Sequence, residues 1–182
     1  MRTKTLMTPV IVAALALSIG ACGKKDKPVA DGGSAKSAEI PASVIASTAP
    51  DGALSVVEAR AAAKPGEPIT LRGKVGGKMK PISDAAAILV LADEKAIKSC
   101  DENPDDLCET PWDYCCEESA TIAASTATIQ VRDADGKLVR ATLRGMSDLK
   151  ELSHIVVSGT VDATSTATAL IVNADKIHVE KP

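Results

Sequence analysis

A stretch of alternating side chains constrains the fold of this 182-residue chain more than any other feature. Between residues 67 and 75 every second position is apolar or glycine, while Thr70, Arg72 and Lys74 occupy the positions between them. This period of two is typical of a β-strand that buries one face and exposes the other. The stretch therefore predicts a half-buried strand rather than a helix.

Further segments rich in Val, Ile, Leu and Ala predict more strands at 86–92, 128–132, 137–144, 154–161 and 169–179. Asp133 to Gly136 suits a tight turn, so we expect 128–132 and 137–144 to form a hairpin. We also expect a short helix at 53–63, which Lys64-Pro65-Gly66 ends, and one or two helical turns at 147–152 with Ser147 as N-cap.

This order of elements resembles the OB-fold, a five-stranded Greek-key barrel with a helix between its third and fourth strands. The resemblance covers about residues 67–180 and implies an all-β domain of small α content. Gly73 and Gly159, each inside a predicted strand, suit a bulge or a close approach of two backbones. A small β-sandwich would share much of the pattern. Since the chain has no Phe, smaller aliphatic side chains must fill the core.

The N-terminus has the features of a secretory signal peptide over residues 1–21. Arg2 and Lys4 precede an apolar run at 10–17, and Ile-Gly-Ala leads directly to Cys22. A signal that ends on Cys resembles the bacterial lipoprotein lipobox, which implies a lipidated Cys22 and a lasting membrane anchor. An ordinary secreted protein with Cys at this position is the alternative. Gly23 is not the aspartate that retains lipoproteins at the inner membrane, so the family rule favours the outer membrane.

Residues 22–51 form the lipidated Cys and a flexible tether by composition, because Gly, Pro, Ser, Ala and Lys dominate them. The barrel domain is then expected at 52–182. Removal of residues 1–21 takes away two basic groups and changes the formal net charge from −3 to −5. This balance and the expected compartment argue against nucleic-acid binding, which needs clustered cations.

A cysteine-rich insertion is expected at about 93–126. It holds all four cysteines that remain after lipidation: Cys100, Cys108, Cys115 and Cys116. An even number in an oxidising compartment predicts two disulfides whose pairing is open. A bond between neighbouring Cys115 and Cys116 would strain the chain, so we expect one of them to pair with Cys100 and the other with Cys108. These bonds would staple a loop that lacks a core.

The alternative interpretation of this loop is a zinc, copper or calcium site built from its thiols and carboxylates. The spacing argues against it, since structural zinc sites pair their cysteines two to four residues apart and no EF-hand pattern is present. We therefore expect no metal and no cofactor. Trp112 and Tyr114 are the candidates for binding a ligand or partner, because aromatic residues are enriched at interfaces. Packing on the barrel end is their alternative role.

The segments 73–77 (GKVGG), 110–117 (TPWDYCCE) and 148–153 (DLKELS) are together similar to a group of small exported bacterial proteins. The resemblance implies an architecture and no catalytic residue. His154 and His178 are the only imidazoles, and no nucleophile or phosphate-binding motif accompanies them. We therefore expect a non-catalytic, lipid-anchored binding or assembly module that faces the periplasm or cell exterior and contacts an envelope protein or a small ligand. A metal-handling lipoprotein is the alternative.

Overall fold

The computed structural model describes residues 39–181. The alternating stretch of the sequence forms strand β2. The strands are β1 (Leu54–Ser55), β2 (Pro68–Val75), β3 (Ile88–Ala92), β4 (Thr126–Gln130), β5 (His154–Val161) and β6 (Leu170–Val179). The helices are α1 (Val56–Ala62), α2 (Ser119–Ala124) and 3-10 turns at Ala42–Val44, Cys100–Glu102 and Met146–Asp148.

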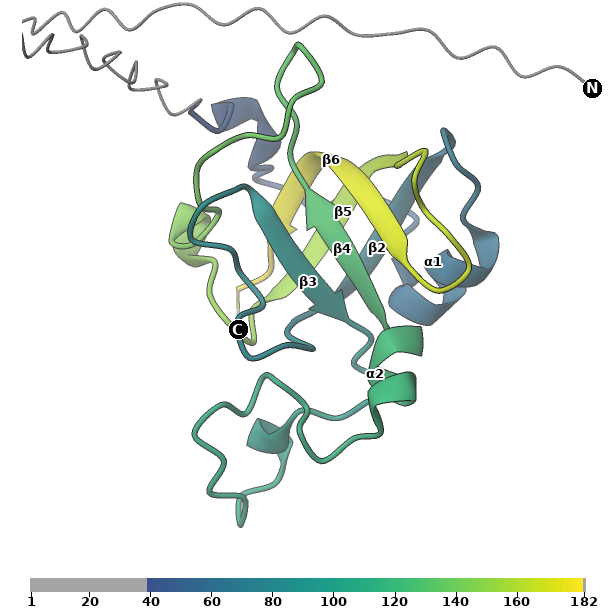
Figure 1. Ribbon diagram of the computed structural model, residues 1–182. Coiled ribbons are helices and arrows are strands. Elements are labelled where there is room, and N and C mark those ends of the chain that lie inside the picture. The colour runs from purple at the N-terminus through teal and green to yellow at the C-terminus, as the bar shows by residue number, and fades with distance from the viewer. Residues whose placement is uncertain (1–38, 182) are drawn as a thin grey trace, which may run out of the picture. The chain divides into compact units, whose positions relative to one another are not determined.

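The strands close into a barrel (Figure 1). Their order is β1-β2-β3-β4-β6-β5, and β2 also pairs with β5, so β2 to β6 form a ring of five strands. Within the ring β4 and β6 are parallel and the other neighbours are antiparallel. A five-stranded Greek-key barrel in this order is OB-like. The expected fold class is confirmed.

Aliphatic side chains fill the barrel, as the lack of Phe requires. Fully buried members from the five ring strands include Leu71, Val75, Leu89, Leu91, Ile129, Ile155, Val157, Val172 and Ile177. Two strand glycines let backbones pack at the barrel's tight bends. A Cβ on Gly73 would collide with the carbonyl oxygen of Ala92, and one on Gly159 with that of Asn173. Gly159 also lies at a register shift of β5 against β6.

The helix expected at 53–63 is present as α1 and begins with a capping box. Ser55 Oγ accepts from Glu58 N at 3.3 Å, and Glu58 Oε2 accepts from Ser55 N at 2.8 Å. Val56 and Ala59 are fully buried against the barrel. α1 therefore packs against the barrel, and Arg60 near its C-terminal end bonds to the first residue of β4.

Two predictions for the segment between β4 and β5 are wrong. The turn Asp133–Gly136 forms, but 137–144 is no strand beyond one bridge between Arg132 and Leu138. Val139 and Leu143 instead enter the core, which draws the chain across the barrel end. The helix expected at 147–152 is replaced by the 3-10 turn. Ser147 does not cap it, since its φ is 47° and its side chain makes no capping bond.

The expected tether differs from the structure in its last third. Ile40 and Val44 are buried, and Ala46 N donates to the carbonyl of Ile177 at 2.8 Å. Residues 40–46 therefore lie along β6 as part of the domain. The predicted signal peptide, Cys22 and tether residues up to 38 lie outside the described residues. Between residues 39 and 181, no helix has the length and hydrophobicity that a membrane crossing requires.

Candidate binding groove and cysteine loop

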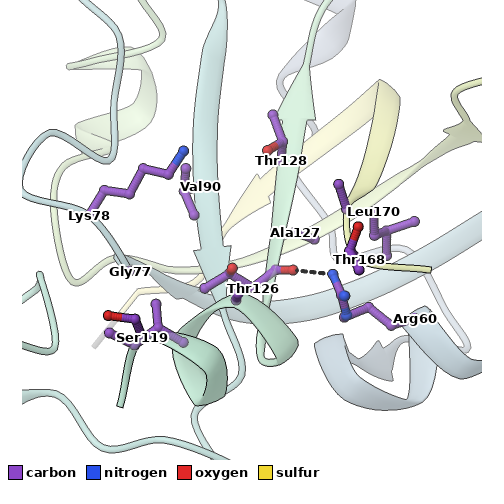
Figure 2. Close-up of a pocket in the computed structure, with 13 residues that line it drawn as sticks. Arg60, Gly77, Lys78, Val90, Ser119, Thr126, Ala127, Thr128, Thr168 and Leu170 are labelled. Carbon is purple, nitrogen blue, oxygen red and sulfur yellow. Dashed lines mark hydrogen bonds between the residues drawn. The ribbon is translucent and has the colours of Figure 1, made fainter. Parts of the chain in front are cut away.

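A groove with a volume of about 390 Å³ lies on the outer face of β3 and β4 (Figure 2). Val90 and Thr128 line its floor, while their sequence neighbours Leu89, Leu91 and Ile129 point into the core. Its walls come from four other segments: Gly77 and Lys78 of the β2–β3 loop, Ser119, Ile122 and Ala123 of α2, Thr168 and Ala169 of the β5–β6 loop, and Arg60 of α1.

Arg60 fixes the groove wall through two backbone contacts. Its Nη1 donates to the carbonyl of Thr126 at 2.9 Å, and its Nη2 donates to the carbonyl of Ala167 at 3.0 Å. These bonds join α1, β4 and the β5–β6 loop. A guanidinium carries five N–H donors, so donors remain after these two bonds. No carboxylate forms an ion pair with Arg60 among residues 39–181.

The groove lining is positively charged. Arg60 and Lys78 are its charged residues, and Ser and Thr hydroxyls and aliphatic side chains supply the rest. The lining has no carboxylate, imidazole, thiol or aromatic ring. A site of this chemistry can hold an anionic or hydroxylated group at one end and an apolar body against Val90, Ile122 and Leu170.

Sequence reasoning missed this groove because its residues come from five separate segments. None of them forms a motif in the sequence. The available signal was the fold itself, since ligands of OB barrels bind across the second and third strands and the loops beside them. In this chain those strands are β3 and β4, and the loops are β2–β3 and β5–β6.

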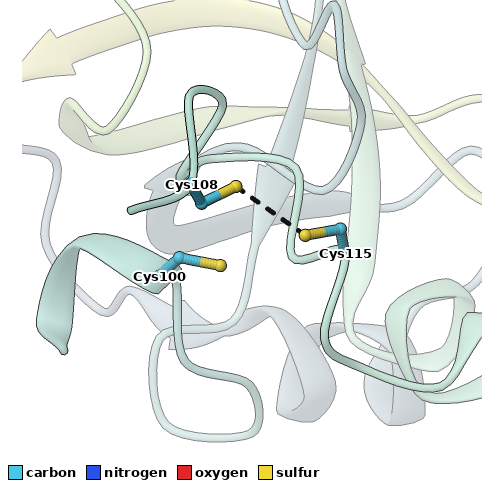
Figure 3. Close-up of side chains that lie close together, drawn as sticks. All are labelled: Cys100, Cys108 and Cys115. Atoms are coloured by element: carbon cyan, nitrogen blue, oxygen red, sulfur yellow. Dashed lines mark hydrogen bonds between the residues drawn. The ribbon is translucent and has the colours of Figure 1, made fainter. Parts of the chain in front are cut away.

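The cysteine loop is the insertion between β3 and β4 and lies at the end of the barrel beside α2 (Figure 1). Its four thiols gather in one region, as Figure 3 shows for three of them. Cys108 Sγ and Cys115 Sγ are 3.7 Å apart. Two clusters of possible ligand atoms are present, and within each cluster all atoms lie within 4.8 Å of one another. Cys100, Cys108 and Cys115 form one cluster, and Cys100, Asp106 and Cys116 form the other.

Burial raises the pKa of Cys100 to about 12, and the nearby Asp106 carboxylate adds to this effect. The pKa of Cys115 is also raised, first by its hydrogen-bond contact with Cys108. Both thiols are therefore protonated at neutral pH when they are neither oxidised nor bound to a metal. They lack the cationic surroundings that a nucleophilic cysteine needs.

Lys74 attaches the start of the loop to the barrel. It lies on the outer face of β2, as the alternation predicts, yet it is only 5% exposed because the loop covers it. Its Nζ lies 2.9 Å from Ser99 Oγ, 3.1 Å from Glu102 Oε1 and 3.7 Å from Asp101 Oδ1. The loop's acidic composition thus has a structural use, since two of its carboxylates pair with a buried ammonium.

Tyr114 attaches the other end of the loop and is not available to a partner. Its ring is 1% exposed and packs with Ala92 and Ile97. The ring reaches this position because Gly76 has no side chain: a Cβ there would lie 2.8 Å from Tyr114 Cε2 and 2.7 Å from the carbonyl oxygen of Trp112. The same carbonyl accepts from Gly77 N at 2.8 Å.

Of the two aromatic binding candidates, only Trp112 is partly exposed. Its indole Nε1 donates to the carbonyl of Met79 at 3.1 Å. The histidines lie outside the groove lining. His154 Nδ1 is 2.8 Å from Glu94 Oε2, and His178 Nδ1 is 3.0 Å from the carbonyl of Ala46.

No protein-family model and no curated protein matches the chain. Among solved structures it is similar to the hypothetical protein ygiW from E. coli. The sequence identity is 14% and the TM-score is 0.35, over 72% of this chain and 94% of that one.

Proposed function

We propose that this protein is a lipid-anchored, extracytoplasmic binding module that does not catalyse a reaction, and that its binding site is the groove on β3 and β4. The observation that carries the proposal is the groove itself. Its volume of about 390 Å³ falls in the usual range for small-molecule sites. The lipobox-like segment that ends at Cys22 supports the anchor and the compartment.

The lining favours a small ligand with an anionic group and an apolar body. Arg60 and Lys78 give the groove a positive potential in a chain whose net charge is negative. Aliphatic side chains of β3, α2 and the β5–β6 loop provide the surface for the apolar part. A single-stranded nucleic acid fits poorly, because such ligands need aromatic side chains for base stacking.

The lining has no carboxylate, imidazole or thiol, which supports a binding role over a catalytic one. General acid–base chemistry needs a titratable group within hydrogen-bond reach of the reacting atom. The two histidines lie outside the groove lining, and the thiols lie in the cysteine loop. The groove therefore favours binding through orientation and charge complementarity.

A calorimetric titration with 8-anilinonaphthalene-1-sulfonate, a small aromatic anion, tests the groove. The protein is the full mature chain with Cys22→Ser, which removes the lipid site. Ala123→Trp on α2 should fill the groove and abolish binding, while Ala124→Trp should leave binding unchanged. Both positions are exposed on the same helix, but only Ala123 lines the groove. Equal effects of the two substitutions would place the site elsewhere.

The charge contribution is tested separately at the β2–β3 loop. Lys78→Glu reverses a charge in the lining, and Lys80→Glu makes the same change at an exposed position outside it. We expect weaker binding of the anion for Lys78→Glu alone, with a difference that shrinks at high salt. If Lys78→Glu binds the anion as tightly as the control, the ligand class is wrong.

A second candidate function is metal handling by the cysteine loop. The observation that favours it is the pair of three-residue clusters around Cys100. Titration of the reduced mature chain with zinc alone tests it. Stoichiometric binding that protects the thiols from alkylation would support this candidate, and alkylation at an unchanged rate would reject it.

A further inference from the structure

The four thiols of the cysteine loop can form two disulfides in three possible pairings. The distances between the sulfurs in the structure distinguish these pairings. Cys108 and Cys115, with their sulfurs 3.7 Å apart, share one cluster with Cys100. Cys100 also shares the second cluster with Cys116. Cys108 and Cys116 share neither cluster. The arrangement that pairs Cys100 with Cys115 would therefore leave Cys108 and Cys116, which share no cluster, to pair.

The arrangement that pairs Cys100 with Cys108 requires a bond between the adjacent Cys115 and Cys116. Such a bond closes a small ring through one peptide unit, which cannot keep its ordinary planar trans geometry without strain. The remaining arrangement places both sulfur pairs within 4.8 Å and needs no such ring. We propose that the protein carries two disulfides, Cys100–Cys116 and Cys108–Cys115.

The same geometry favours disulfides over a four-thiolate metal site. A tetrahedral zinc ion with Zn–S bonds near 2.3 Å holds all four sulfurs about 3.8 Å from one another. In this loop the four sulfurs do not form one such set, because Cys116 is grouped with Cys100 and Asp106 and not with Cys108 or Cys115. Bonds from Cys108 to Cys115 and from Cys100 to Cys116 each join two sulfurs that share a cluster.

Each bond forms by thiol–disulfide exchange with an oxidant that itself carries a disulfide, the class of oxidant found in the compartments where secreted proteins fold. A protein thiolate attacks the oxidant and forms a mixed disulfide, and its partner thiol then displaces the oxidant as a dithiol. Two thiols lose two protons and two electrons, which the oxidant takes up. Two such reactions remove four hydrogen atoms from the chain.

The two bonds would brace one wall of the groove, a consequence that rests on the proposed function. Cys116 lies three residues before Ser119, the first residue of α2, and α2 supplies Ser119, Ile122 and Ala123 to the wall. Trp112, inside the loop, holds Gly77 of the opposite wall through its carbonyl. Cys100–Cys116 joins the barrel-bound start of the loop to the segment that enters α2.

The pairing is tested on the mature chain with Cys22→Ser, purified without reductant from an oxidising compartment. We expect an intact mass lower by the four hydrogen atoms of two disulfides and no thiol that alkylates after denaturation. The double variants Cys100→Ser/Cys116→Ser and Cys108→Ser/Cys115→Ser should each retain one closed disulfide. The mismatched control Cys100→Ser/Cys115→Ser, which leaves Cys108 and Cys116, should show two free thiols.

Free thiols in both matched variants together with a closed bond in the mismatched control would overturn the pairing. So would four thiols in the unsubstituted chain that alkylate only after a metal is removed. If the variants do not fold, gas-phase fragmentation of the unreduced peptide 99–132 assigns the bonds in the unsubstituted chain. These measurements do not involve ligand, so they stand even if the groove binds no anion. Reduction should weaken sulfonate binding only if both proposals hold.

Discussion

Alkaline unfolding tests the burial of Tyr114, the residue on which docking of the cysteine loop depends. Burial raises the pKa of Tyr114 from its ordinary value near 10 to about 12. Above pH 10 the unfolded chain therefore loses this proton while the folded chain keeps it, and stability falls as pH rises. Each pKa unit corresponds to 1.36 kcal/mol, so we expect a total loss of about 2.7 kcal/mol, of which about 2.3 kcal/mol is reached by pH 12.

The assay compares urea unfolding of the unsubstituted chain and Tyr114→Phe from pH 9 upward, with Trp112 fluorescence as the probe. Lysines titrate in both proteins, so the difference between them isolates Tyr114. Its hydroxyl has no hydrogen-bond partner within the described part of the chain. Tyr114→Phe should thus be neutral or more stable by about 1 kcal/mol at pH 7. Since the chain has one Tyr, phenolate absorbance follows it directly.

Two results would refute the burial of Tyr114 on which this prediction depends. The first is a native phenolate that forms near pH 10, as it does in an exposed tyrosine. The second is an equal loss of stability with pH in the unsubstituted chain and the Phe variant. Either result would mean that the loop does not hold its ring against Ala92 and Ile97.

Three further predictions concern the barrel and its loop. Lys74→Met should lower the free energy of unfolding by about 1 kcal/mol, because Asp101 and Glu102 are about one-third exposed and stay solvated. The double substitution Asp101→Asn/Glu102→Gln should lower it by about 3 kcal/mol, because it leaves the buried Lys74 ammonium without a carboxylate. Urea unfolding measures both losses, and equal losses would contradict this difference. Gly73→Ala should cost at least 2 kcal/mol through its backbone collision, which a thermal melt detects. The hydrogen bonds that Thr164 donates through its side chain and its amide hold the pKa of Asp162 far below its usual range, so Asp162 stabilises the fold fully above about pH 4 and less as pH drops. Asp162→Asn should therefore reduce the fall of the free energy of unfolding below pH 4, as measured by urea unfolding. An unchanged fall would count against these bonds.

Alternating polarity and β-branched residues predicted the strand ends to within about two residues. β2, β5 and β6 follow the expected segments closely, because each buries one whole face in the barrel. The segment 137–144 has the same composition but no free strand edge to join, since β4 already pairs with β3 and β6. The composition of a segment thus predicts that its side chains are buried. Whether the segment forms a strand depends on an unpaired strand edge, which the closed ring does not offer here.

The candidate site was less predictable because it depends on contacts between segments distant in sequence. Only Asp113 separates Trp112 from Tyr114 in the chain, yet Trp112 is partly exposed and Tyr114 is buried in the core. The difference arises at Gly76, where the missing Cβ admits the Tyr114 ring. No property of the TPWDYCCE segment alone contains this information.

The position of the cysteine loop gives it a direct influence on the groove. It is inserted between β3 and β4, the two strands that form the groove floor. Its neck is closed by Asp93 N, which donates to the carbonyl of Ser125 at 2.8 Å, and the loop ends in the helix that forms one wall. Changes within the loop can therefore move the groove wall and leave the barrel ring intact. This separation predicts that reduction of the two proposed disulfides lowers affinity for the sulfonate probe before it lowers the cooperativity of barrel unfolding.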